Sequence, residues 1–146
     1  MPTSSRFAVA VHVLALLARA GDEPLKSEQV ASSVNTNAVV IRRVLCALAR
    51  AGLVASQTGA SGGTRLARPP REITLREVYR AVEPRVIFAP HRQPPNPKCP
   101  VGMHIESVLQ GILADVDIAV DEALGQTTIE AVVEAVKPRA GSRGRK

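Results

Sequence analysis

The sequence predicts a mostly α-helical protein with a small β-hairpin, arranged as a winged helix-turn-helix followed by a long C-terminal dimerisation helix. Three of the 146 residues are aromatic, so the core must be built from aliphatic side chains, which suits closely packed helices. The expected element order is helix, short helix, turn, helix and glycine-rich hairpin, which is the order of a winged helix-turn-helix. A long amphipathic stretch over residues 101–124 then predicts the final helix.

The first helix is expected to begin after Ser4 or Ser5 and to end at Gly21. Apolar residues recur along it with a period near 3.6, which predicts one buried face. They are Phe7, Ala10, Val11, Leu14 and Leu17. The same apolar run followed by Ala18-Arg19-Ala20 is also compatible with a signal peptide, but His12 at its centre disfavours that alternative.

The helix-turn-helix is expected in residues 26–51. Residues 26–33 predict a short helix, residues 34–37 a polar turn, and residues 37–51 a third helix ending before Gly52. Its inward side chains are expected to be Val40, Ile41, Val44, Leu45 and Leu48. Cys46 lies within this helix and is expected to be a packing residue.

The wing is expected to follow at once. Residues 53–57 and 64–67 predict two strands, joined by the flexible Thr58–Gly63 turn and closed by Pro69-Pro70. Thr74 is then expected to cap a helix that reaches Glu83, with Glu77 completing a capping box.

Charge is unevenly distributed along the chain. Residues 1–70 hold eight basic and three acidic residues, residues 71–136 hold six and ten, and residues 137–146 hold five basic residues and no acidic one. A basic first half joined to an acidic middle predicts a polyanionic partner for the first half.

Double-stranded DNA is the partner that this pattern favours, because the major groove admits one helix whose N-terminal residues meet the base edges. An asparagine there would recognise adenine, a threonine a phosphate or a thymine methyl group, and an arginine guanine or phosphate. Arg65 in the wing would enter a minor groove. The alternative is that Arg42 and Arg43 belong to a solvated helix face. The candidate DNA-binding residues are Thr36, Asn37, Val39, Arg42, Arg43, Gln57, Ser61, Gly62, Gly63 and Arg65.

Two stretches resemble a known family. Ala60–Pro70 with Ile73-Thr-Leu-Arg-Glu-Val78 is similar to the Rrf family of bacterial winged-helix regulators, which includes the IscR, NsrR and CymR types. Asn96–Gly102 resembles the YwnA-like branch, and the resemblance covers about residues 3–135. It implies a homodimer whose long helix is exchanged across the two-fold axis, and a loop before that helix that senses an effector of unknown identity.

The cysteines set further expectations. Two cysteines without a CxxC spacing predict a reducing, cytoplasmic location and no metal. Cluster-binding members of the Rrf family carry three cysteines in the loop, whereas this chain has Cys99 with His91 and His104 nearby, so no cofactor is expected. Cys99 follows Lys98 at the start of a helix, and both features favour its thiolate. A redox sensor and an ordinary loop cysteine both stay open.

The organisation expected from these patterns has four parts. Residues 1–83 bind DNA, the proline-rich residues 84–100 form a sensor loop, residues 101–136 form dimerisation helices, and residues 137–146 are a disordered basic tail. No stretch approaches the roughly 20 apolar residues of a membrane span. The dimerisation stripe is expected at Ile105, Val108, Ile112, Val116 and Ala119.

The function expected is therefore a homodimeric, sequence-specific transcriptional regulator, a repressor rather than an enzyme, bound to a palindromic operator. Its response to an oxidant or a small molecule would pass through the Cys99 loop. Two alternatives stay open: a winged-helix module for protein binding, and an enzyme that uses Cys99 with His91 or His104.

Overall fold

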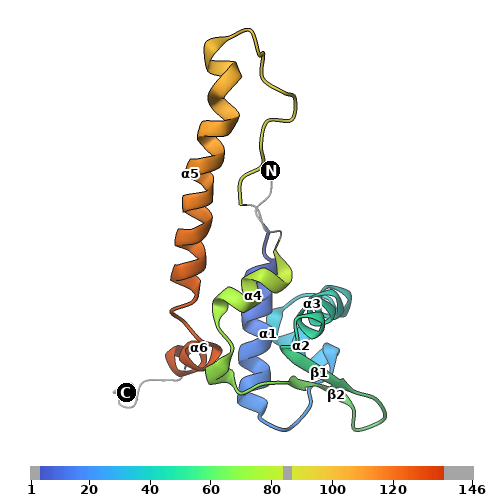
Figure 1. The fold of residues 1–146 in the computed structure, drawn as a ribbon. Helices are drawn as coiled ribbons and strands as arrows, with labels where there is room; N and C mark the ends of the chain where they lie inside the picture. Colours follow the sequence, from blue (N-terminus) through green and yellow to red (C-terminus); the bar gives the residue numbers. More distant parts are fainter. Residues whose placement is uncertain (1–3, 84–86, 137–146) are drawn as a thin grey trace, which may run out of the picture.

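The computed structural model describes residues 4–83 and 87–136. Figure 1 shows one rounded body from which a single long helix projects. The predicted mostly helical fold with one hairpin and a long C-terminal helix is confirmed. The predicted basic tail at residues 137–146 lies outside the described residues. In chain order the elements are α1 (Arg6–Ala20), α2 (Ser27–Val34), α3 (Ala38–Arg50), β1 (Val54–Gln57), β2 (Gly63–Leu66), the 3-10 turn η1 (Pro70–Glu72), α4 (Leu75–Val82), α5 (Pro100–Leu124) and α6 (Ile129–Val136).

The core of the rounded body is aliphatic, as the scarcity of aromatic residues predicts. Helix α1 crosses its centre and contacts α3, α4 and α6. Where α1 and α4 meet, Phe7 and Tyr79 make an edge-to-face contact with ring centroids 5.8 Å apart. The largest fully buried side chains are Leu14, Leu17, Ile41, Leu48, Leu53, Ile73 and Ile129.

The β1–β2 hairpin is tied to the segment between α1 and α2. Val54 pairs with Leu66 and Gln57 with Gly63 in an antiparallel register. Leu25 adds an isolated bridge, because its N–H donates to the Thr64 carbonyl at 2.9 Å and its carbonyl accepts from Thr64 N–H at 2.8 Å. The end of β2 next to the turn is therefore held to the rounded body by backbone hydrogen bonds.

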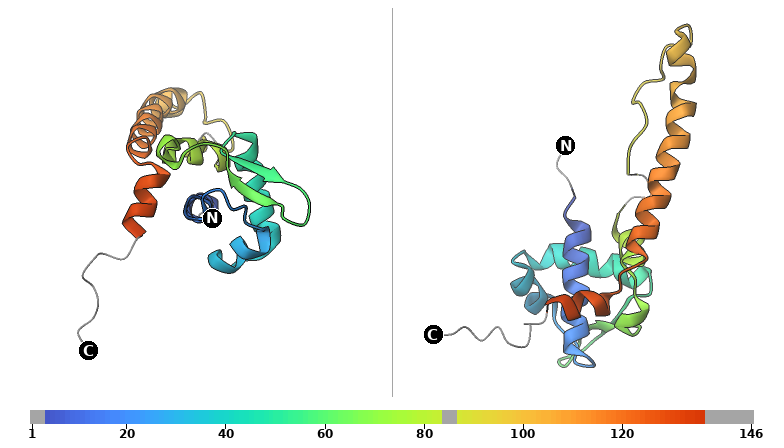
Figure 2. Two further views of the ribbon diagram at one scale, coloured as in Figure 1. Left: turned by 90° about the horizontal axis from the view of Figure 1, so that it is seen from below. Right: turned by 90° about the vertical axis from the view of Figure 1, so that its left-hand side faces the viewer.

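Helices α5 and α6 have different surroundings, although residues 101–136 were expected to act as one dimerisation unit. None of the residues of α5 is buried, whereas α6 packs against α1 and η1 and buries Ile129 completely. The turn before α6 is held by Leu75 N–H on the Thr127 carbonyl and Ile129 N–H on the Ile73 carbonyl, both at 2.9 Å. The right-hand view of Figure 2 shows α5 leaving the body and α6 lying across it.

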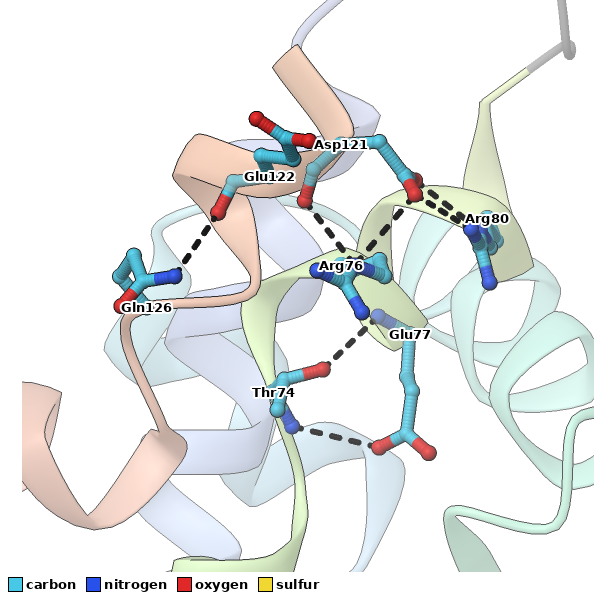
Figure 3. A network of polar contacts seen from close by, with 7 residues as sticks. All are labelled: Thr74, Arg76, Glu77, Arg80, Asp121, Glu122 and Gln126. Carbon is cyan, nitrogen blue, oxygen red and sulfur yellow. Dashed lines mark hydrogen bonds and ion pairs between the residues drawn. The ribbon is translucent and has the colours of Figure 1, made fainter. Parts of the chain in front are cut away.

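The base of α5 is joined to α4 by an arginine–aspartate network (Figure 3). Arg80 donates to both carboxylate oxygens of Asp121, and Arg76 Nε donates to the Asp121 carbonyl at 2.9 Å. Gly125 makes room for this network, because a Cβ atom there would lie 2.1 Å from the Arg76 guanidinium. In the part of the chain that the structure describes, no helix combines the length and the hydropathy needed to cross a bilayer.

Candidate nucleic-acid interface

Helices α2 and α3 form the predicted helix-turn-helix. Asn35 ends α2 in the left-handed conformation, with φ of 60°, which asparagine tolerates better than most residues. Thr36 N–H then donates to the Ala31 carbonyl at 3.1 Å, which closes the turn. The chain reverses within three residues, so α3 begins at the surface of the body.

One face of α3 is buried and the other is exposed. Of the predicted inward residues, Ile41, Val44, Leu45 and Leu48 are buried, and Val40 is half-buried. The expectation that Cys46 packs in the core is wrong, because its side chain is exposed. Cys46 follows Val39 by seven residues and Arg42 by four, and these spacings place all three on the outer face.

Asn37 caps the N-terminus of α3. Its Oδ1 accepts a hydrogen bond from Val40 N–H at 3.0 Å. Bidentate recognition of adenine needs that oxygen together with the amide nitrogen. The cap uses one lone pair of Oδ1, and the Nδ2 group stays available to donate to a phosphate oxygen or a base acceptor.

The two adjacent arginines of α3 differ in whether they form an ion pair. Arg42 forms an ion pair with Glu28 of α2, with Nη2 and Oε1 3.1 Å apart, and both side chains are more than half exposed. Arg43 is also exposed, and the described residues give it no ion-pair partner. Hydrogen bonding from its own backbone, together with Arg42, lowers the pKa of Glu28, so the pair is ionised at neutral pH.

The wing divides the candidate residues into surface and scaffold positions. Gln57, Ser61 and Arg65 are exposed. Gly62 is buried, its N–H donates to the Gly59 carbonyl at 3.0 Å, and a Cβ atom would lie 2.4 Å from the Gln57 carbonyl oxygen. Gly63 is equally constrained, with the Leu25 carbonyl oxygen 2.7 Å from a Cβ position. Both glycines therefore shape the wing.

Helix α3 and the hairpin lie on the side of the body away from α5 and α6 (Figures 1 and 2, left). The predicted residues that are exposed come from the start and the outer face of α3 and from the hairpin, with arginines supplied by α3 and by β2. An edge of this kind, a helix N-terminus beside a basic hairpin, has the shape and the charge to lie across a duplex.

Cys99 is the residue immediately before α5. Met103 N–H donates to its carbonyl at 2.8 Å, and Cys99 N–H donates to the Asn96 carbonyl at 3.2 Å. Hydrogen bonds from the backbone N–H groups of Gly102 and Val101 lower the pKa of the exposed thiol. The helix start predicted to favour the thiolate therefore does so, and Lys98 is not among the causes.

A groove lies between the segment that precedes α5 and the middle of that helix. It encloses about 800 Å³ and is mainly apolar. Phe88, which is 53% exposed, borders it together with Leu109 and Leu113 of α5. His91 and Glu106 supply polar groups at its edge, so the groove is suited to a small molecule of mixed polarity.

The chain is similar to proteins described as transcriptional regulators or as DNA-binding proteins. The profile of the Rrf2 family, described as an iron-dependent transcriptional regulator, matches residues 3–135. YwnA of Bacillus subtilis, a candidate HTH-type transcriptional regulator, is 41% identical over 131 residues, which cover 89% of this chain and 96% of YwnA. A crystal structure of a candidate DNA-binding protein is 39% identical with a TM-score of 0.72, over 88% of this chain and 98% of that one.

The structure of T. potens IscR has the same fold. Its TM-score is 0.72 at 22% identity, over 99% of this chain and 94% of that one. The donor set of this chain does not fit an iron–sulfur cluster, which needs about four ligands, mostly thiolates. Cys46 lies on α3 and Cys99 precedes α5, and residues 4–83 and 87–136 contain no group of three or more His, Cys, Asp or Glu side chains able to hold a metal ion.

Proposed function

Because this chain belongs to the Rrf2 family of transcriptional regulators, we propose that it binds a palindromic operator as a homodimer and represses transcription. The observation that carries the proposal is the outer face of α3 next to the basic hairpin. In such a dimer two copies of α3 enter major grooves about one helical turn apart. The place of action is the cytoplasm, where the DNA of a bacterium lies.

In this proposal residues 1–83 form the DNA-binding unit. Thr36 and the Nδ2 group of Asn37 contact phosphates at the start of α3, and Arg42 and Arg43 contact phosphate or guanine. Val39 faces the bases between them. Gln57 and Ser61 of the wing face the adjacent backbone, and Arg65 enters the minor groove. Gly62 and Gly63 contribute by shaping the hairpin.

The dimer contact is assigned to α5. Val108 is 55% exposed and Ile112 is 53% exposed, although both are large and apolar, so water contacts surface that a second chain would bury. Ile105, Val116 and Ala119 extend the same stripe at spacings of three and four residues. Two copies of the stripe packed across a two-fold axis would form an isologous interface.

The effector is assigned to residues 84–100 and the middle of α5. Cys99 is exposed, its pKa is lowered, and the 800 Å³ groove lies beside the same segment. An oxidant at Cys99 or a small molecule in the groove would tilt α5 and change the distance between the two copies of α3. A differential binding free energy of about 1–3 kcal/mol is enough for such coupling.

The proposal is tested by selecting bound duplexes from a random pool, with sedimentation to determine the oligomeric state. We expect a dimer and an enriched palindrome whose affinity falls steeply with salt. The double variant Arg42→Ala with Arg43→Ala should make that salt dependence less steep. A monomer with no enriched sequence would refute the proposal, and unaltered binding by the double variant would refute the assignment of α3.

A further inference from the structure

Val39 is an apolar side chain on a surface whose other features are polar. It is 52% exposed and lies in the first turn of α3. Of residues 4–83, it alone is a large hydrophobic residue exposed to this degree, since the others lie in or after the segment that precedes α5. An isolated exposed valine is ordinary on a protein surface. Val39 is of interest because it lies on the face of α3 that the proposed function assigns to base contact.

Two polar neighbours of Val39 already have partners within the protein. Asn37 uses its Oδ1 in the cap, and Arg42 is held by Glu28 at 3.1 Å. Arg43 follows Val39 by four residues, so both lie on the same side of the helix, one turn apart. Contacts to bases from the first turn of α3 must therefore depend strongly on the valine methyl groups.

We propose that Val39 packs against the C5 methyl group of a thymine in each half of the operator, and so determines specificity at that base. This inference rests on the proposed function. Of the four bases, thymine alone presents a methyl group in the major groove, and apolar side chains are its usual partners. A valine against the polar edge of another base would leave a donor or an acceptor without a partner, which is unfavourable.

The expected change in operator affinity follows from the apolar area of the thymine methyl group that Val39 would bury. Burial of one methyl-sized group contributes about 0.8 kcal/mol, which corresponds to about a fourfold change in affinity per half-site. Two equivalent half-sites bound by a dimer would give about a fifteenfold change, the product of two fourfold effects. An effect of this size is easily measured in a direct binding titration.

The test changes the DNA first, so that the fold of the protein is not disturbed. The thymines of the selected operator are replaced by deoxyuridine, one symmetry-related pair at a time, which removes only the C5 methyl group. One pair should lose about fifteenfold in affinity, and the others should lose little. If no pair responds while the operator is still bound specifically, the inference fails and the proposed function stands. If no duplex is bound specifically, both fail.

The second arm changes the protein. Val39→Ala should bind the deoxyuridine operator as tightly as the unchanged protein does and should show a weaker preference for thymine at the sensitive pair, because alanine retains a single methyl group. Val136→Ala is the matched control, because Val136 is 64% exposed on α6, away from α3. A Val39→Ala protein that discriminates thymine from deoxyuridine as strongly as the unchanged protein would overturn the assignment. Thermal melting confirms that both variants are folded.

Discussion

Asp121 of α5 accepts two hydrogen bonds from Arg80 of α4, from Nε at 3.1 Å and from Nη2 at 2.5 Å. A bidentate pair of this kind fixes orientation as well as distance. Arg76 adds a second connection to the Asp121 carbonyl and carboxylate. The Asp121 side chain is 33% exposed, so the pair is only partly screened by water. The joint therefore holds α5 at a defined angle to the rounded body.

Asp121→Asn is expected to loosen this joint, because it removes the charge and one acceptor while keeping the size of the side chain. The free energy of unfolding should fall by about 1 kcal/mol, the upper range for an ion pair at the surface. Operator affinity should fall further, since in the proposed dimer the separation of the two copies of α3 depends on the angle of α5. Denaturation and operator titration measure the two effects.

Asp115→Asn is the matched control for that experiment. It removes the same charge from an exposed position of α5, and the structure shows no ion pair there among the described residues. Equal loss of operator affinity in both variants would mean that charge alone matters, and the assigned role of the joint would be wrong.

Glu28→Gln should release Arg42, because the amide cannot hold the guanidinium as the carboxylate does. We expect tighter binding to random duplex, a steeper salt dependence, and a smaller ratio of specific to nonspecific affinity. Glu23→Gln is the control, since it removes an exposed acidic group from the loop between α1 and α2. Equal effects in both variants would mean that the change in net charge, and not the release of Arg42, causes them.

The lowered pKa of Glu28 predicts a pH range in which the Arg42–Glu28 pair gives operator binding no pH dependence. The pKa of Glu28 is lowered from 4.5, so the pair is intact above that value and is lost only as pH falls through the lowered pKa. Between pH 6 and pH 8, operator binding should therefore show no pH dependence that Glu28→Gln removes. A dependence that disappears in the variant would contradict the lowered pKa.

Local signals in the sequence predicted the parts of the fold that depend on neighbouring residues. Thr74 and Glu77 form the expected reciprocal cap, with Glu77 N–H on Thr74 Oγ1 at 3.3 Å and Thr74 N–H on Glu77 Oε2 at 3.2 Å. Helical periodicity likewise identified the buried face of α3 around Ile41 and Leu48. Such features are determined within one or two turns, so they can be recognised without knowledge of the fold.

Features that depend on contacts between distant segments were harder to predict. Ile129 is buried against elements far earlier in the chain, and no local pattern shows that α6 returns to α1. The Arg42–Glu28 pair depends on the angle between two helices. Cys46 was misassigned because cysteine is often buried, although its spacing from Val39 and Arg42 already placed it on the outer face of α3.

The wing offers a test of the roles given to its glycines. Gly63→Ala would place a methyl group 2.7 Å from the Leu25 carbonyl oxygen, so the bridge between Leu25 and Thr64 must open. We expect faster hydrogen exchange at those two amides and weaker operator binding, with a destabilisation of about 1–3 kcal/mol. Ala60→Ser changes the exposed tip without crowding and should leave exchange unaltered. Unchanged protection in Gly63→Ala would show that this end of β2 tolerates the methyl group.

The two cysteines provide the most direct test of which surface meets DNA. Both are exposed. Hydrogen bonds from Gly102 and Val101 N–H lower the pKa of Cys99 below its usual 9.0. A larger fraction of Cys99 is therefore in the reactive thiolate form at neutral pH than of an unperturbed thiol. In the free protein, iodoacetamide should modify both cysteines, and lowering the pH should slow the reaction of Cys99 less than that of a free thiol in solution.

Saturating operator DNA should protect Cys46, which lies on the outer face of α3, and should leave Cys99 reactive. Mass spectrometry of Cys99→Ser and Cys46→Ser proteins assigns each modification. Modification of Cys46 at an undiminished rate in the complex would mean that the outer face of α3 does not lie against the duplex.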